Sequence, residues 1–331
     1  MDDAVESRLP RAAPRPRGVV ARTVAGEVES YTNAVAGIEI EAVRAGQAVG
    51  PTRVLTAIGE RFAFTACGVG VPMLSRMTLD DDKIIVAHVI SAARGCRWCE
   101  IDLEPGTVLV YGSSAEHTAR NLPGLDFMFA VAGRQQLEDH AAQLGIRIET
   151  PPRGEVRELA RTPRTDLVGG AFTRFAGAAA TGMYPSTAFS DDVLRAAAHA
   201  LSEQGVVRRI GCSNRIDSRR VVHACIGYAE SIARIPSISE LCLVAYVSER
   251  RLREAFVQEY ALPPSRFFRA WALNEAHRRL LHAEIDEQTV TEVATGLGFG
   301  HLGRFSGQYR DVYGENPSTT LEFCTHRPSV A

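Results

Sequence analysis

Three arginines, Arg250, Arg251 and Arg253, lie close together in the stretch ISELCLVAYVSERRLREAFVQEY (238–260). The guanidinium group of arginine donates hydrogen bonds in a fixed fork that matches a phosphate or the edge of a guanine base. The cluster can therefore contact nucleic acid if one helix presents these side chains on its outer face. An isolated charged run is more often only a solvated helix face, so the surrounding elements decide between the two interpretations.

The flanking residues predict a short helix, a tight turn and a second helix over 238–260. Ser237 and Glu240 fit a capping box at the start of the first helix. Leu252 and Phe256, four residues apart, mark the buried face of the second. At about 100° per residue, the outward positions of that helix are Arg250, Arg251, Glu254 and Gln258, with Arg253 beside them. This layout is typical of a helix-turn-helix, whose second helix enters the major groove of DNA.

The same pattern occurs a second time, over 290–313. Thr289 and Glu292 repeat the capping box at an offset of 52 residues, and Phe305 and Tyr309 repeat the buried pair at an offset of 53. A paired repeat is far more specific than a single motif. The predicted contact residues of this second unit are His301, Arg304, Ser306 and Arg310. Its outward face also carries two glycines, so fewer base contacts are expected there.

A helix predicted over 265–282 joins the two units. It would be roughly 27 Å long, and one turn of B-DNA is about 34 Å. A rigid spacer of this size can place two helices in neighbouring major grooves. Because another amphipathic helix is predicted just after Ser218, the whole block at 218–321 is expected to be all-α.

This block resembles the DNA-binding domain of the AraC/XylS family of bacterial transcription regulators. The resemblance is carried by VSERRLREAF (247–256), PPSRFFRAWALNEAHRRLL (263–281) and above all VATGLGFGHLGRFSGQYRDVYGENPS (293–318). It implies a sequence-specific DNA-binding regulator and favours an activator. It also implies promoter DNA and RNA polymerase as partners, a homodimer, and a small-molecule effector.

Three positions depart from the family pattern. Tyr246 and Ala261 stand where the family usually has glycine, so a left-handed backbone there would cost about 1 kcal/mol each. Ala272 replaces an arginine common in the connecting helix. The expected consequence is some loss of stability, with the family assignment unchanged.

The N-terminal half predicts an antiparallel β sandwich or barrel. Period-two runs of strand composition, separated by turn residues, occur at 38–44, 61–67, 83–90, 106–112 and 125–132. The stretch EPGTVLVYGSSAEHTA (104–119) resembles the cupin-like strand pair in the sensor domains of the same family. Helices are expected over 134–144 and 191–204, the second capped by Ser190 and a candidate for the dimer interface.

The predicted fold class is multi-domain α+β. A β-rich effector-sensing and dimerisation domain is expected at 19–204, a linker at 205–217, and the DNA-binding domain at 218–321. Residues 1–18, rich in proline and arginine, and residues 322–331 are predicted to be tails.

A cupin-type metal enzyme with an attached helical domain is the main alternative. Its open metal site normally needs two histidines one residue apart, a carboxylate and a third histidine. Here His88 and His117 are solitary, and the sequence contains no HxH. Solitary histidines on a β fold are more often structural than ligating, so no metal site and no enzymatic activity are predicted.

A redox-sensing regulator is the second alternative. Cys96 and Cys99 form a CxxC, the spacing of redox dithiols and of half a zinc site. No second CxxC completes a zinc site, and residues three apart in a strand face opposite sides. The pair could meet in a turn, so this alternative stays open.

Charge, hydropathy and the absence of further motifs exclude several other classes of protein. The net charge is −2, and residues 205–331 hold 16 arginines against 14 acidic residues, a net of +2. No apolar run approaches 18 residues and no h-region opens the chain, so neither a membrane span nor a signal peptide is predicted. A cytoplasmic protein is expected. Neither a Walker loop nor a serine-nucleophile motif is present, so no cofactor is predicted.

Overall fold

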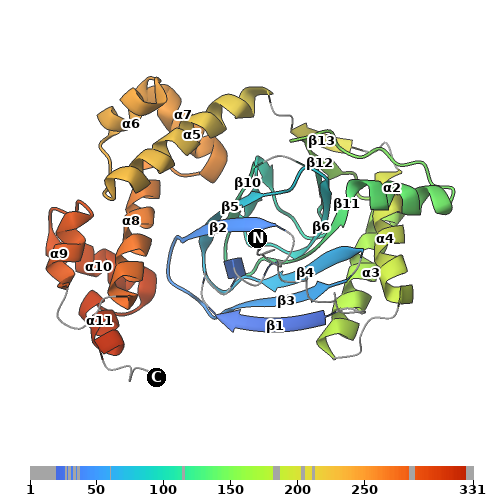
Figure 1. Ribbon diagram of the computed structural model, residues 1–331, viewed down its shortest axis with the longest axis horizontal. Helices are drawn as coiled ribbons and strands as arrows, with labels where there is room; N and C mark the ends of the chain where they lie inside the picture. Colours follow the sequence, from blue (N-terminus) through green and yellow to red (C-terminus); the bar gives the residue numbers. More distant parts are fainter. Residues whose placement is uncertain are drawn as a thin grey trace, which may run out of the picture.

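The computed structural model contains a β sandwich with helices on one side and a separate block of helices (Figure 1). The residues that it describes are 20–26, 28, 31–32, 35, 38–59, 61–113, 116–181, 187–202, 206–210, 213–282 and 288–325. The tail predicted at 1–18 lies outside them. The start of the tail predicted at 322–331 is wrong, because helix α11 (Pro317–Thr325) includes the first four residues of that range.

Two antiparallel sheets form the sandwich. The larger has eight strands, in the order β1 (Val20–Gly26), β3 (Thr52–Ile58), β4 (Phe62–Gly68), β11 (Asp126–Gly133), β6 (Lys83–Ser91), β9 (Val108–Tyr111), β12 (Val156–Leu159) and β13 (Val206–Ile210). The smaller has five, in the order β2 (Glu39–Arg44), β5 (Met73–Thr78), β10 (Glu116–Asn121), β7 (Arg97–Trp98) and β8 (Ile101–Asp102). The predicted antiparallel β architecture is confirmed.

Strand β11 shows how alternating side chains divide the core. Phe127 and Phe129 join the cluster between the two sheets, together with Trp98. Met128 and Ala130 point to the other face of the large sheet and join a second cluster under the helices. Successive side chains of a strand point to opposite faces. Because both faces of β11 are covered, its sequence is apolar almost throughout.

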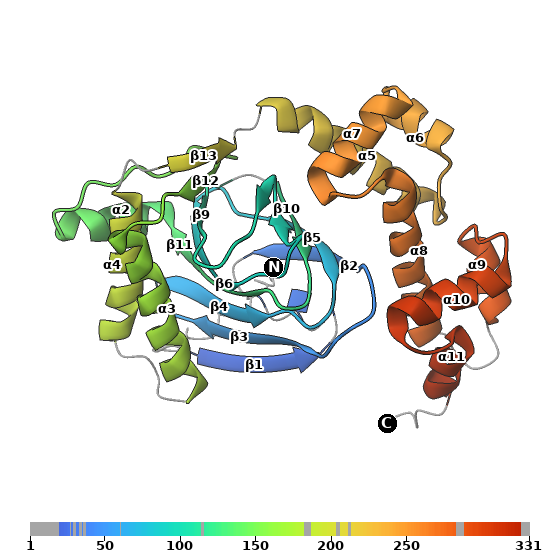
Figure 2. The ribbon, with the colours of Figure 1, turned by 180° about the vertical axis from the view of Figure 1, so that it is seen from behind.

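Helices α2 (Arg134–Gln143), α3 (Pro163–Ala180) and α4 (Thr187–Leu201) cover the outer face of the large sheet (Figures 1 and 2). The ring of Phe172 packs edge-on against Phe64 at 5.4 Å. Thr162 starts α3 with a capping hydrogen bond from Thr165 N, and Pro163 occupies the first helical position. This helix lies in a stretch for which the sequence predicted no element.

Helix α4 differs from its prediction over 191–204. It begins at Thr187, so Ser190 is inside the helix and buried rather than its cap. The apolar residues of α4, such as Val193 and Leu194, are buried against α3 and the sheet. A helix whose apolar face is already covered offers little to a second subunit, which argues against α4 as the dimer interface.

The predicted linker at 205–217 is also wrong in part. Strand β13 (Val206–Ile210) pairs with β12 and forms an edge of the large sheet. Helix α5 (Ser213–Ile232) then begins within the same predicted linker. The strand was missed because it is only five residues long and its partner lies about 50 residues earlier.

The C-terminal block is all-helical, as predicted. After α5 it contains α6 (Ile238–Ala245), α7 (Glu249–Tyr260), α8 (Pro264–Leu281), α9 (Val290–Gly296), α10 (Leu302–Tyr313) and α11. Two helix-turn-helix units, α6–α7 and α9–α10, are joined by α8, which confirms the predicted fold class. Within the described residues, no helix has both the length and the apolar character needed to cross a membrane.

Both units start with the same capping box. The N–H of Glu240 donates to Ser237 Oγ at 3.2 Å, and the N–H of Ser237 donates to the Glu240 carboxylate at 2.8 Å. Thr289 and Glu292 repeat both hydrogen bonds. Arg234, together with the cap, lowers the pKa of Glu240 to about 2. The carboxylate therefore remains ionised, and able to accept these bonds, at neutral pH.

Tyr246 holds the turn of the first unit in a left-handed conformation, with φ at 54°. Its side chain is 94% exposed, so it adds little packing. We expect Tyr246→Gly to raise the free energy of unfolding by up to about 1 kcal/mol, because glycine adopts this backbone without a Cβ clash. Urea unfolding measures the change. Tyr246→Ala is the control, since it removes the ring but keeps the Cβ; an equal gain in both variants would contradict the backbone explanation.

Candidate nucleic-acid interface

Helix α7 presents two of its arginines to solvent. The side chain of Arg250 is 90% exposed, and its Nε donates to Glu254 Oε1 at 2.9 Å. Arg253 and Glu254 are exposed as well. An exposed ion pair of this kind contributes only about 0.3–0.5 kcal/mol. Arg250 can therefore exchange Glu254 for a phosphate or a base edge at little cost.

The other two predicted contact residues of α7 face the rest of the protein. Arg251 Nη2 donates to Ser218 Oγ at 2.9 Å. Ser218 Oγ donates to Gln258 Oε1 at 2.7 Å, and Gln258 Nε2 donates to Glu100 Oε1 at 2.5 Å. The prediction that Gln258 points outward is wrong, because it lies between α5 and the sandwich. Val257, 42% exposed, takes the outward position instead.

Helix α10 exposes fewer side chains that could contact DNA than α7 does. Of its predicted contact residues, His301, Arg304 and Arg310 are exposed and Ser306 is half-buried. A Cβ added at Gly303 or Gly307 would meet nothing within 4 Å. Packing within the protein therefore does not require glycine at either position, and both leave the helix backbone open to solvent.

Helix α8 fixes the two units relative to each other. Phe267 and Phe268, near its start, are buried in the core of the first unit. Ala276 and Leu280, near its end, are buried in the core of the second. Trp271 packs against both cores. Its 18 residues span roughly 27 Å, so α8 acts as a rigid spacer.

A partly buried hydrogen-bond network holds α8 to the second unit. His277 Nδ1 lies 2.5 Å from the hydroxyl of Tyr309, which lies 2.8 Å from Thr320 Oγ1. Burial, with a smaller effect of Arg44, lowers the pKa of His277 to about 4. His277 is therefore neutral at pH 7 and can accept the hydrogen bond from Tyr309.

The two solitary histidines lie in different cores of the sandwich. His117 is buried between the sheets, with its ring 4.5 Å from that of Tyr111. His88 faces helix α3, where a Cβ at Gly169 would touch its ring. The pKa of His88 is lowered by burial. Two histidines on opposite sides of a sheet cannot share a metal ion, and no group of three or more potential ligands occurs among the described residues.

Cys96 and Cys99 are buried and not bonded to each other. Burial raises the pKa of the Cys96 thiol, which disfavours the reactive thiolate. Cys99 Sγ lies 3.8 Å from His117 Nδ1, inside the core. A redox sensor needs an accessible thiolate, so the geometry does not favour this alternative.

Two capped helix-turn-helix units, each with an exposed second helix and joined by a rigid third, define a double helix-turn-helix DNA-binding domain. Residues 241–322 match the helix-turn-helix domain family. The match covers α7 to α10 and most of α6 and α11.

Two curated relatives match part of the chain. Over 102 residues the chain is 31% identical to the probable thc operon regulatory protein of Rhodococcus erythropolis. Over 95 residues it is 34% identical to the XylDLEGF operon transcriptional activator of Pseudomonas putida. The matches cover 30% and 29% of this chain, and only 31% and 30% of the two relatives. Through this domain the chain belongs to the AraC/XylS family.

Solved structures give similar matches. A probable AraC family transcriptional regulator from Rhodopseudomonas palustris is 32% identical, and the match covers 34% of this chain and 99% of that one, with a TM-score of 0.29. The AraC-like transcriptional activator CuxR is 11% identical over 72% of this chain and 88% of its own, with a TM-score of 0.39.

Proposed function

We propose that this protein is a sequence-specific transcription regulator that binds promoter DNA through α7 and α10, and that it is not an enzyme. The observation that carries the proposal is the duplicated unit, in which both second helices present arginine on an exposed face. Shared sequence with two operon regulators supports it. Because one of them is a transcriptional activator, we also propose that this protein activates transcription with RNA polymerase as its partner.

The first unit would make the base contacts. Arg250 and Arg253, exposed near the start of α7, can bind guanine edges bidentately or neutralise phosphates. Glu254 can accept a hydrogen bond from a cytosine amino group. Arg251 and Gln258 would first have to leave Ser218, so their contribution to DNA binding is expected to be smaller.

The sandwich is docked on the DNA-binding domain and can regulate it. Arg44 N donates to Asn274 Oδ1 at 2.8 Å, and Asn274 Nδ2 donates to Arg44 O at 2.9 Å. The Arg44 guanidinium lies 4.8 Å from the ring centre of Tyr313, at the end of α10. Thr118 donates to the buried Glu259 of α7 at 3.1 Å. These contacts reach both units, so a change in docking would act on both recognition helices.

An effector would control DNA binding only through a difference in affinity between two domain arrangements. We therefore retain a small-molecule effector and a homodimer as parts of the proposal. The exposed face of α3, which includes Leu167 at 50% exposure, suits a dimer contact better than the buried α4.

Fluorescence anisotropy with the full chain and promoter fragments tests the proposed function. Binding should be specific for one fragment and should weaken steeply as salt is added, because arginines that neutralise phosphates release counterions. Equal binding to all fragments, or affinity independent of salt, would count against the proposal.

The two recognition helices, α7 and α10, are expected to contribute unequally to sequence specificity. Gly303 and Gly307 offer no side chain to a base, so α10 should contribute mainly backbone contacts through Arg304 and Arg310. A genome-wide map of bound DNA should give a binding-site matrix with more information in the half read by α7. A matrix with more information in the other half would refute this.

A further inference from the structure

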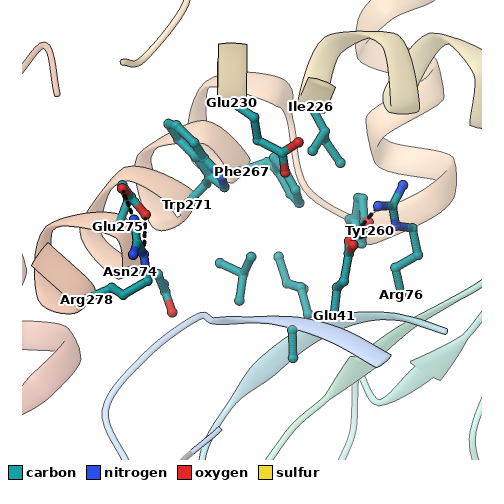
Figure 3. Close-up of a pocket in the computed structure, with 13 residues that line it drawn as sticks. Glu41, Arg76, Ile226, Glu230, Tyr260, Phe267, Trp271, Asn274, Glu275 and Arg278 are labelled. Atoms are coloured by element: carbon teal, nitrogen blue, oxygen red, sulfur yellow. Dashed lines mark hydrogen bonds and ion pairs between the residues drawn. The ribbon is translucent and has the colours of Figure 1, made fainter. Parts of the chain in front are cut away.

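A cleft of about 270 Å³ lies between the sandwich and the helical block (Figure 3). Strands β2 and β5 of the small sheet form one wall, and helices α5, α7 and α8 form the other. Because each wall belongs to a different domain, the cleft exists only while the domains are docked. A molecule bound in it would therefore stabilise the docked arrangement.

Much of the cleft is apolar. Leu74 of β5 belongs to the same cluster as Phe267 and Ile226 of the helical block. The indole of Trp271 lines the cleft and is only partly buried. Figure 3 shows Trp271 and Phe267 on the helical side of the cleft, opposite the strands that form the other wall. These surfaces can bury the apolar body of a small molecule.

The charged groups of the cleft are unequally paired. Arg76 Nη2 binds Glu41 at 2.5 Å. Arg278 Nη2 binds Glu275 at 2.7 Å. Both guanidinium groups of the cleft are thus already occupied by carboxylates. Glu230 is exposed, and its carboxylate makes no hydrogen bond or ion pair to any other residue in the described part of the chain. It points toward the cleft between Ile226 and Phe267 in Figure 3.

We propose that this cleft binds a small organic cation, such as a protonated amine or amidine on an aromatic or alkyl body. Glu230 would accept a charge-assisted hydrogen bond from the cationic group. Trp271 would cover the apolar body and attract the cation through the face of its ring. The regulatory consequence, a shift in domain docking, rests on the function proposed above, whereas the binding itself does not.

Two observations favour a ligand in this cleft rather than between the sheets, and a positive rather than a negative charge on that ligand. A pocket between the two sheets, lined by residues that include Trp98 and Phe127, has a volume of only about 10 Å³, barely enough for one water molecule. An anion in the larger cleft would have to displace Glu41 from Arg76 or Glu275 from Arg278. The negative charge of Glu230 would also repel it.

Benzamidine, with the neutral benzamide and the anionic benzoate, tests the proposal on the full chain. The protein contains two tryptophans, so its ¹H–¹⁵N spectrum has two indole resonances, which Trp271→Phe assigns. Benzamidine should shift the Trp271 resonance saturably. The buried Trp98, which donates to Asn121 at 2.8 Å, should not respond. Benzamide and benzoate should bind at least roughly tenfold more weakly, since each lacks the charge-assisted hydrogen bond.

Glu230→Gln should weaken benzamidine binding by roughly tenfold or more, while Asp139→Asn serves as a matched control. Asp139 is an exposed carboxylate on helix α2, on the far side of the sandwich. Unchanged binding in Glu230→Gln, equal binding of the three probes, or no saturable shift would each overturn the proposal. Because no DNA is present, these outcomes leave the proposed DNA-binding function to its own test.

Discussion

Replacing Arg253 by alanine is expected to weaken specific DNA binding by ~1–3 kcal/mol, the value of one good base contact. Arg250→Ala should have a similar effect, because both side chains project from the exposed face of α7. Neither arginine is needed for the core, so the melting temperature should barely change. Fluorescence anisotropy with the bound promoter fragment, and thermal unfolding of each variant, measure the two quantities.

Arg147→Ala is the matched control, since it removes an exposed arginine from the sandwich and changes the net charge equally. It should leave the affinity nearly unchanged. Wild-type affinity in both α7 variants would mean that this helix does not enter the groove. A large loss in melting temperature would instead show that the arginines support the fold.

Phe256→Ala is expected to lower the free energy of unfolding by ~3–5 kcal/mol, the range for removing a buried phenyl ring. Phe256 has no exposed surface. Its ring centre lies 5.4 Å from those of both Phe267 and Phe268, which joins α7 to α8. Losing this ring removes the packing that orients the first recognition helix. Urea unfolding followed by circular dichroism measures the change.

Val257→Ala, the adjacent position, controls for helix propensity and general effects of substitution on α7. Its side chain is 42% exposed, so it should cost no more than about 0.5 kcal/mol. If the two variants had equal stability, Phe256 could not be the residue that anchors α7 to α8.

Local signals in the sequence predicted the helical block well. The capping boxes at Ser237 and Thr289 determine where two helices begin, and both act through residues three positions away. The apolar pairs Leu252/Phe256 and Phe305/Tyr309 likewise identify the buried faces. Such features need no knowledge of distant residues.

Features that depend on distant partners were missed or misplaced. Strand β13 exists because β12 offers it an edge, and strands β7 and β8 have only two residues each. Gln258 faces inward because Glu100, 158 residues earlier, accepts its hydrogen bond. The contact between Arg44 and Asn274 spans 230 residues. Nothing in one sequence reveals such pairings.

We propose that α7 and α10 read one DNA site together, held apart by α8. Selection of bound sequences from a random DNA pool by the purified full chain tests this most directly. We predict one enriched bipartite motif, with two half-sites about one helical turn, roughly 10–10.5 base pairs, apart. Substitution of Arg253 should relax the motif in only one half. Enrichment of no motif, or of a single half-site without its partner, would contradict the account.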